Sequence, residues 1–505
     1  MAPLFRLSSP QVDLLKASLP RCMRLASTMG AKKEGDISSV FVSLSGGKAS
    51  ELPSRFTDVK KRLIQGREDE VKRSWDRLLD RLKEEIEVIK SKGSDIIPII
   101  EYKDIRSAPK SFGEELRKRG VAVIRGVVPE KEARSYKEEI EEYVRKNPGT
   151  KAFPQHDPQV FELYWSKPQI RARAHPNMID AQRFLMSFWH SNKLEAMISP
   201  SHPLAYADRL RIRQPGDTGF ALGPHVDGGS VERWEENGYG LGGVYEKIWQ
   251  GRWEEYDPWE ADCRVPVVSD LYNGAGACSM FRMFQGWLSM SRSGPFEGTL
   301  LVNPILSLST AYFLLRPFFT PVESLQPGEA SQSAVQAYLS PSNWILESST
   351  TSTIQGGSLG HTQELNETLH PHLELSKTMV HVPETKPGDY VAWHCDTIHA
   401  VDKVHQGKGD SSVLYIPACP LTETNVKYVQ RQKEAFIQGT PGPDFPGGKG
   451  ESEHIGRANE AYLREVADVD ALRAFGFEAW DAEDPTLNSG HIKLLRKANQ
   501  ILGFP

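Results

Sequence analysis

The spacing of hydrophobic and polar positions changes along the chain. Residues 56–92 repeat apolar positions every three or four residues, which predicts one long amphipathic helix. The apolar run VAVIRGVV at 121–128 predicts a strand, and Pro129 is typical of the first turn of a following helix. Helical spacing prevails again between 150 and 200. The N-terminal part of the chain is therefore predicted to be mainly helical.

From about residue 204 the pattern changes to short β-type runs separated by glycine and proline. RLRIRQPGD alternates like a strand and ends in a turn signal. Further runs of this type are GTLLVNP, TAYFLLRPFF, TMVHVPE, DYVAWH and SSVLYIPACP. Several short strands joined by such turns indicate a β-sandwich or barrel. Helical spacing returns over 430–505.

Two long excursions interrupt the predicted β region. The first is rich in tryptophan and tyrosine, and the second is rich in serine and threonine. Long excursions in a compact domain are usually lids or disordered segments. The aromatic one is too apolar to stay loose, so it is predicted to pack over a ligand or over the sheet. The predicted organisation is an N-terminus at 1–50, a helical region at 51–203, a β core at 204–424 with excursions at 231–296 and 325–375, and a helical region at 425–505.

Composition excludes several classes of protein. The 505 residues include 39% hydrophobic residues, and the net charge is −5 without a block of either sign, so no nucleic-acid partner is predicted. No apolar run reaches the roughly 18 residues that span a bilayer, so no membrane partner is predicted either. Cysteines are few and lack a C-x-x-C, which favours a reduced, cytoplasmic location. A start with Arg and Ser and few acids leaves a mitochondrial location as the alternative. The cysteines are Cys22, Cys263, Cys278, Cys395 and Cys419.

The stretch ALGPHVDGGS contains a candidate half of a metal site, His225 and Asp227. A non-haem iron site needs two neutral imidazoles and one carboxylate on one face of the metal, with the other positions open. In a strand, residues i and i+2 point to the same side, about 7 Å apart. The pair follows a predicted strand and a Gly/Pro loop, which would place it at the mouth of a β core.

The third ligand must come from a strand far away in sequence. The segment KPGDYVAWHCDTIHAVDKVHQGKGDSSVLYIPA offers His394, His399 and His405. His394 also forms a second His-x-Asp pair with Asp396. That competing pair would need a later histidine, but the near ones are too close to come from a separate strand and the far ones lie in helical sequence. His394 is therefore interpreted as a packed strand histidine.

Several motifs resemble those of a known enzyme group. GDYVAWHCDTIHAV is similar to the distal-histidine segment of iron(II)/2-oxoglutarate-dependent oxygenases of the phytanoyl-CoA dioxygenase-like group. GPHVDGG is similar to the first ligand motif of that group, GPFEGTLLVNP resembles the strand after its first excursion, and FGEELRKRGVAVIRGVVPEKEA resembles its N-terminal lead-in. This resemblance implies that His225, Asp227 and His399 hold Fe(II), with 2-oxoglutarate and O2 as cosubstrates.

Over residues 50–440 the chain more closely resembles the domain-of-unknown-function 1479 family of fungi and bacteria. GPHVDGGSVERW, WEADCRVPVVSDLYNG and FLLRPFF carry this resemblance. It implies an α+β protein whose core is a double-stranded β-helix, a jelly roll of the cupin-like kind, between helical N- and C-terminal regions.

The chain departs from the group's pattern where the 2-oxoglutarate C5 carboxylate should bind. Relatives place an arginine about a dozen residues after the distal histidine, whereas this chain has Ser411 and Ser412 there. A buried carboxylate without a cation is costly, so another base should substitute. Arg316 is the first candidate, Arg213 the second and Lys408 the third, with Ser411 as an additional contact. A structural salt bridge is the alternative for either arginine.

The resemblance implies a small-molecule substrate and leaves its identity open. Some fungal members are associated with forming an aziridine from valine, so hydroxylation or oxidative ring closure of an amino acid is a specific expectation. Arg282, Asn273 and Asp270 are candidate substrate contacts within the aromatic excursion 231–296, which would act as a lid. The rival readings are a cupin-like metal enzyme that does not use 2-oxoglutarate and a non-catalytic binding protein. The oligomeric state is not predicted.

Overall fold

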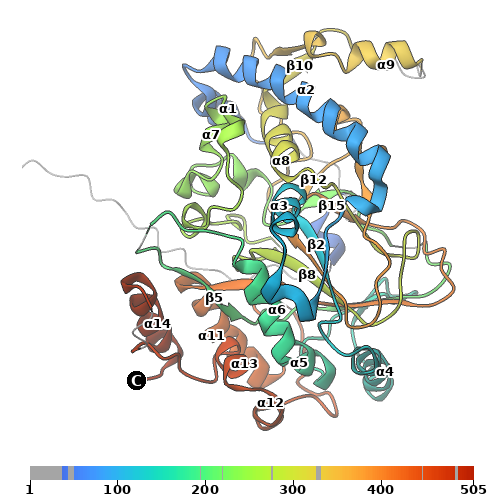
Figure 1. Ribbon diagram of the computed structural model, residues 1–505, viewed down its shortest axis with the longest axis vertical. Coiled ribbons are helices and arrows are strands. Elements are labelled where there is room, and N and C mark those ends of the chain that lie inside the picture. Colours follow the sequence, from blue (N-terminus) through green and yellow to red (C-terminus); the bar gives the residue numbers. More distant parts are fainter. Residues whose placement is uncertain are drawn as a thin grey trace, which may run out of the picture. The chain divides into compact units, whose positions relative to one another are not determined.

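The structure mixes helices with two antiparallel-rich β-sheets (Figure 1). Within the part of the chain that the structure describes, no helix is both long and apolar enough to cross a membrane. The computed structural model describes residues 37–43, 51–193, 195–218, 220–274, 277–325, 331–445, 447–483 and 487–505.

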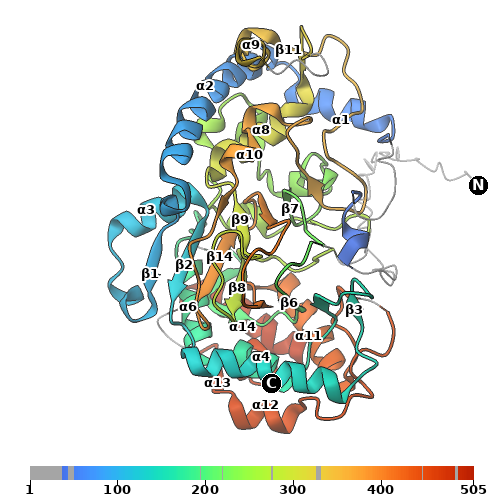
Figure 2. The same cartoon turned by 90° about the vertical axis from the view of Figure 1, so that its right-hand side faces the viewer.

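The larger sheet has eight strands, and every neighbouring pair is antiparallel except the parallel pair β1 and β2. Figure 2 shows β1, β2, β14, β8 and β6 following one another across the view. The strands in spatial order are β1 (Ile99–Glu101), β2 (Val121–Arg125), β14 (Tyr390–His394), β8 (Phe284–Ser289), β16 (Ser411–Tyr415), β6 (Leu210–Arg213), β4 (Val160–Phe161) and β3 (Ala152–Phe153).

The smaller sheet has five strands that alternate along the chain with those of the larger one. The chain passes from β6 to β7, β8 and β9, and later from β14 to β15 and β16, changing sheet at each step. Strands distant in sequence thereby become neighbours. The five strands are β12 (Gln363–Glu364), β7 (His225–Val226), β15 (His399–Val401), β9 (Leu300–Val302) and β13 (Val380–His381). Two further pairs are β5 (Ile198–Leu204) with β17 (Cys419–Thr422) and β10 (Phe319–Pro321) with β11 (Trp344–Leu346).

The helix expected over 56–92 is two helices, α1 (Arg55–Ile64) and α2 (Glu68–Lys92). The chain turns at Gly66, whose φ of +72° is in the left-handed region that favours glycine. Acidic residues in the first turn of α2 and basic residues in its last turn suit the helix dipole. The buried face of α2 packs along α8 (Figures 1 and 2). The other N-terminal helices are α3 (Lys110–Arg119), α4 (Glu130–Lys146), α5 (Lys167–Ala174) and α6 (Pro176–Met186).

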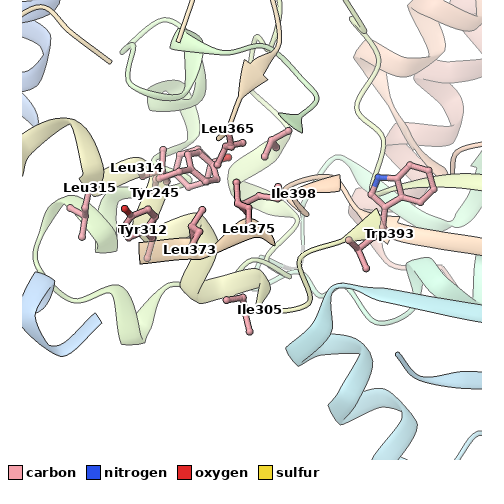
Figure 3. Close-up of a cluster of buried hydrophobic side chains, with 14 of the residues drawn as sticks. Tyr245, Ile305, Tyr312, Leu314, Leu315, Leu365, Leu373, Leu375, Trp393 and Ile398 are labelled. Atoms are coloured by element: carbon pink, nitrogen blue, oxygen red, sulfur yellow. The ribbon is translucent and has the colours of Figure 1, made fainter. Parts of the chain in front are cut away.

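The strand expected at TAYFLLRPFF is wrong, because this run lies mostly in helix α8 (Leu306–Leu315) and the 3-10 turn Arg316–Phe318 that follows. Eight of the ten residues of α8 are buried, so the run carries no polar face from which a helical period could be recognised. Tyr312, Leu314 and Leu315 belong to the buried cluster drawn in Figure 3.

The aromatic excursion 231–296 packs against the core although it contains little regular structure before β8. Its short helix is α7 (Glu246–Trp249), and Trp234, Trp253 and Trp259 are buried. Most of its aromatic rings therefore serve as core. The second excursion holds α9 (Gln332–Tyr338), followed by α10 (Leu375–Thr378), and the C-terminal helices are α11 (Glu423–Gln438), α12 (Glu460–Val466), α13 (Val469–Ala474) and α14 (Ser489–Leu502).

A buried ion pair ties the aromatic excursion to the turn between β14 and β15. Arg264 pairs with Asp396, and both side chains are nearly inaccessible to solvent. The Asp396 carboxylate also accepts hydrogen bonds from Tyr245 (3.0 Å) and Tyr256 (3.1 Å). Burial raises the pKa of Asp396, but Arg264, followed by His394 and Arg233, outweighs it and lowers the pKa well below its usual value. Asp396 therefore has a structural role.

We expect Asp396→Asn to lower the free energy of unfolding by about 3 kcal/mol, because the variant leaves the buried Arg264 without its counterion. Urea unfolding followed by fluorescence measures this change. Asp257→Asn is the matched control, since Asp257 is half exposed and faces His190 at the surface. Its effect should stay within about 0.5 kcal/mol. Equal losses in the two variants would contradict the structural role of Asp396.

Candidate metal centre and cavity

Two histidines and one aspartate meet where two strands of the smaller sheet lie side by side. His225 begins β7, His399 begins β15, and the antiparallel register pairs these two residues directly. Their imidazole centroids are 4.1 Å apart. The Asp227 carboxylate lies 3.6 Å from His225 Nε2 and 3.9 Å from His399 Nε2. All three ligand atoms lie within 4.8 Å of one another, which is close enough to hold one ion.

Backbone carbonyls orient both imidazoles. His225 Nδ1 contacts the Gly223 carbonyl at 2.7 Å, and His399 Nδ1 contacts the Thr397 carbonyl at 3.0 Å. A carbonyl only accepts, so each Nδ1 carries the proton and donates it. Each Nε2 is thereby left as a lone-pair donor facing Asp227. Metal-binding histidines commonly have this outer hydrogen bond, which fixes ring orientation and tautomer.

The charge state of the cluster also suits a cation. Burial opposes the charged form of Asp227, but the neighbouring His225, His399 and Arg282 outweigh it and lower the pKa to about 2. Burial, aided by the nearby His225, lowers the pKa of His399 to about 3. Asp227 is thus anionic and His399 neutral at physiological pH, as metal ligands must be.

Arg233 holds the backbone of the loop that follows Asp227. This buried guanidinium donates to the Asp227 and Gly229 carbonyls, and the Tyr239 hydroxyl donates to the Gly228 carbonyl at 2.8 Å. A Cβ on Gly229 would lie 2.3 Å from a neighbouring carbonyl oxygen, and its φ is +82°. Only glycine fits this approach, so the two glycines after Asp227 shape the loop that presents the carboxylate.

The second pair, His394 and Asp396, does not form an open metal site. His394 Nε2 donates to the Pro258 carbonyl at 3.0 Å, and its Nδ1 accepts from the Asp396 amide at 3.0 Å. The ring stacks on Trp189 with centroids 4.7 Å apart. Both nitrogens are therefore engaged, and His394 is a packed strand histidine as expected.

A cavity of about 960 Å³, including its open mouth, contains the His225–Asp227–His399 cluster. Both sheets contribute to its wall, since His399 comes from β15 and Gln285 and Trp393 come from β8 and β14. Within the described residues, the Gln285 Nε2 and Trp393 Nε1 donors are buried without a hydrogen-bond partner. Such donors are costly unless a ligand supplies an acceptor. Other lining residues are Ile37, Val40, Phe41, Arg209, Arg282, His361, Thr362 and Tyr415.

Two arginines of the cavity wall have donors available for a ligand. Arg209 Nε donates to Asp208 at 3.2 Å, while its two Nη groups have no hydrogen-bond partner among the described residues. Arg282 lies 3.7 Å from the Asp227 carboxylate. Burial opposes its charge, but Cys278, Asp227 and other neighbours outweigh this and raise its pKa well above the usual value. Two arginines thus line the cavity together with the carboxylates of Asp208 and Asp227.

The structure places Arg316, the first expected 2-oxoglutarate anchor, away from the cavity. Its guanidinium donates to the carbonyls of Leu369 (2.9 Å) and Phe319 (2.8 Å) and lies over the Trp344 ring. The side chain stabilises the end of a helix rather than facing a ligand in a strand, as its sequence context had suggested. Lys408 is exposed in a loop.

Arg213, the second expected anchor, also does not line the cavity. It forms a buried salt bridge with Asp217 (2.7 Å) and donates to the Asp402 carbonyl at 2.7 Å. The structural alternative therefore applies to Arg213. Ser411 donates to the Gly298 carbonyl at 3.2 Å and does not line the cavity either.

Of the three expected substrate contacts, the structure brings only Arg282 to the cavity. Asp270 accepts a hydrogen bond from the Gly274 amide at 3.0 Å, and Asn273 has a positive φ of 50° in the same loop. Neither lines the cavity. Arg209, Gln285 and Trp393 were not identified from the sequence. The sequence contains one indication of Arg209, because R-L-R-I-R at 209–213 puts three basic residues on one side of a strand.

The comparisons with known proteins establish the family. The chain belongs to the Gig2-like family, whose pattern matches residues 50–477, and this confirms the resemblance inferred from the motifs. It is 31% identical over 408 residues to the uncharacterized protein YbiU of Escherichia coli K12, which covers 78% of this chain and 88% of that protein.

Solved structures agree over most of the chain. The crystal structure of GlcNAc Inducible Gene 2 (DUF1479) from Candida albicans is 31% identical, with a TM-score of 0.78 over 90% of this chain and 96% of that one. The hypothetical protein JW0805 of Escherichia coli is 30% identical, with a TM-score of 0.68 over 85% of this chain and 99% of that one.

Proposed function

We propose that this protein is a non-haem Fe(II)/2-oxoglutarate-dependent oxygenase whose two sheets form a double-stranded β-helix. The alternation of strands between the sheets supports this fold. The observation that carries the function is the cluster of two imidazole Nε2 atoms and one carboxylate inside the cavity. Two histidines and one carboxylate, with the remaining positions open, are characteristic of iron(II) oxygenases.

The donor set fits the proposed metal. His225, Asp227 and His399 would hold Fe(II) through two nitrogens and one oxygen, and no thiolate belongs to the cluster. When bound, the iron would let O2 oxidise the substrate while 2-oxoglutarate is converted to succinate and CO2. The protein's own contribution is to fix the ligands, orient the substrate and keep water away.

The cavity also fits a dicarboxylate cosubstrate. The Nη groups of Arg209, whose guanidinium lies over the Phe445 ring, would bind its distal carboxylate, in place of the expected Arg316 or Arg213. Arg211 lies next along β6, with a pKa that burial lowers to about 10, and adds positive charge behind Tyr415. The partnerless donors of Gln285 and Trp393 would serve oxygen atoms nearer the metal.

A small anionic molecule is the substrate class that the remaining chemistry favours. Once Arg209 is assigned to the cosubstrate, Arg282 remains beside Asp227 as a cation for a substrate carboxylate. An amino acid satisfies this requirement, with hydroxylation or ring closure such as aziridine formation from valine as the outcome. The cysteines within the described residues are free thiols, which favours a cytoplasmic location for this chemistry.

The rival candidates make different demands on the cavity. A cupin-like metal enzyme without 2-oxoglutarate would need the metal ligands but not an arginine with available Nη groups in the cavity wall. A non-catalytic binding protein would need neither. The metal cluster, together with the Nη groups of Arg209 that have no hydrogen-bond partner among the described residues, favours the oxygenase.

Succinate formation tests the proposal. Anaerobically purified protein is mixed with Fe(II), 2-oxoglutarate, O2 and a panel of amino acids, and succinate is quantified against the His225→Ala variant. We expect at least one amino acid to raise succinate above the uncoupled background in wild type only. No succinate with any substrate, together with no 2-oxoglutarate-induced change in the anaerobic iron absorption spectrum, would exclude this function.

A further inference from the structure

We propose that residues 37–43, here called the strap, form the gate of the metal cavity, and that Phe41 holds it closed against His225. This inference rests on the proposed function only for the identity of the metal. The strap begins with a 3-10 turn, Ile37–Val40, and lies more than 180 positions before the metal ligands in sequence.

The apolar side of the strap is a wall of the cavity. Ile37, Val40 and Phe41 all line it, and Ile37 and Phe41 are only 6% and 4% exposed. The edge of the Phe41 ring packs on the His225 imidazole with centroids 4.8 Å apart. The strap therefore contacts the metal-ligand side chain itself, and it presents an apolar surface to whatever the cavity binds.

The strap is held at the edge of the smaller sheet. The Thr362 amide, just before edge strand β12, donates to the Val40 carbonyl at 2.9 Å, and the Ser43 amide donates to the Glu364 carboxylate at 3.1 Å. Thr362 in turn donates through its hydroxyl to the Val226 carbonyl at 2.8 Å. Release of the strap would therefore expose the Thr362 amide and one side of the metal ligands together.

These contacts suit a gate better than a permanent wall. Backbone pairing with neighbouring strands holds β7 and β15 in the sheet, whereas the strap contacts the sheet edge through the packing of Phe41 and the hydrogen bonds with Thr362 and Glu364. Segments docked in this way open locally at lower free energy than the central strands. A ligand enclosed by Ile37, Val40 and Phe41 can leave past them once the Phe41 ring moves off His225.

Amide hydrogen exchange measures the opening of the strap directly and requires neither bound metal nor catalytic activity. In Phe41→Ala we expect the Thr362 amide to exchange about tenfold faster than in wild type, a change of about 1.4 kcal/mol in opening free energy. The Glu364 amide, which donates to the Gly356 carbonyl instead, should be unchanged. Val42→Ala is the matched control on the same segment, because Val42 does not line the cavity. Unchanged Thr362 exchange in Phe41→Ala, or equal acceleration at Thr362 and Glu364, overturns the proposal.

The rate of metal release is a second, independent measure of the opening of the strap. Protein loaded with Co(II) is mixed with excess EDTA, and loss of the cobalt absorption is followed in time. We expect about tenfold faster release in Phe41→Ala, with Phe41→Leu between it and wild type and Val42→Ala equal to wild type. Equal release rates in all variants overturn the gate. Failure of wild type to bind Co(II) at all overturns the proposed metal site instead, and the exchange experiment still tests the strap.

Discussion

Replacing His225 or Asp227 by alanine is expected to weaken metal binding at least about a hundredfold, because each change removes one of three ligands that no neighbour can replace. Changes to groups that merely support metal ligands already cost about 10- to 100-fold. Isothermal titration of anaerobic protein with Fe(II), or with Co(II) as a stable substitute, measures the affinity. Unfolding of each variant is measured alongside, because removal of Asp227 leaves the nearby Arg282 without that carboxylate.

His361→Ala is the control for that experiment. His361 lines the same cavity, but its Nδ1 contacts the Leu359 carbonyl at 3.0 Å and it is not part of the metal cluster. Its loss should leave the affinity within about twofold of wild type. If His361→Ala or His394→Ala removes the metal while His225→Ala keeps it, the wrong histidines have been assigned.

Part of the candidate metal cluster could be predicted from the sequence, because two of its three residues lie close together in the chain. His225 and Asp227 lie two residues apart, and the segment that supplies His399 has its own turn and strand signals. The sequence does not reveal the register that pairs His399 with His225, which depends on strands brought together by the whole fold. The resemblance to a family supplied that link.

The arginine that would anchor the cosubstrate could not be predicted from the sequence. The sequence favours Arg316 as a cation in an apolar strand, but the run is a helix, and Arg316 at its end donates to the carbonyls of Phe319 and the distant Leu369. Arg213 was second, and Asp217 neutralises it. Whether a buried arginine already has a partner depends on distant backbone, which no local pattern encodes.

The gate likewise depends on a long-range contact. Phe41 lies in an unremarkable stretch near the N-terminus, and nothing in its neighbourhood indicates that its ring packs on a metal ligand. The aromatic excursion was the more obvious lid from composition. Most of its tryptophans are core residues, and the excursion shares the lining of the cavity with Ile37, Val40 and Phe41 of the strap.

Arg209→Ala is expected to raise the Kd for 2-oxoglutarate about thirtyfold, because a charge-assisted pair with a carboxylate contributes about 2 kcal/mol. The two Nη groups of Arg209, which lines the cavity, are available to bind a carboxylate through two hydrogen bonds. Arg209→Lys keeps the charge but loses the fork, so an intermediate Kd is expected. Anaerobic titration of 2-oxoglutarate into Fe(II)-loaded protein measures this Kd, with iron affinity determined separately to show that the metal site is intact.

Arg316→Lys is the control and should leave the Kd unchanged, because the partners of Arg316 are backbone carbonyls away from the cavity. If Arg209→Ala binds 2-oxoglutarate normally and Arg211→Lys does not, the anchor is the next arginine along β6. A normal Kd in both variants would mean that 2-oxoglutarate does not bind at this wall of the cavity.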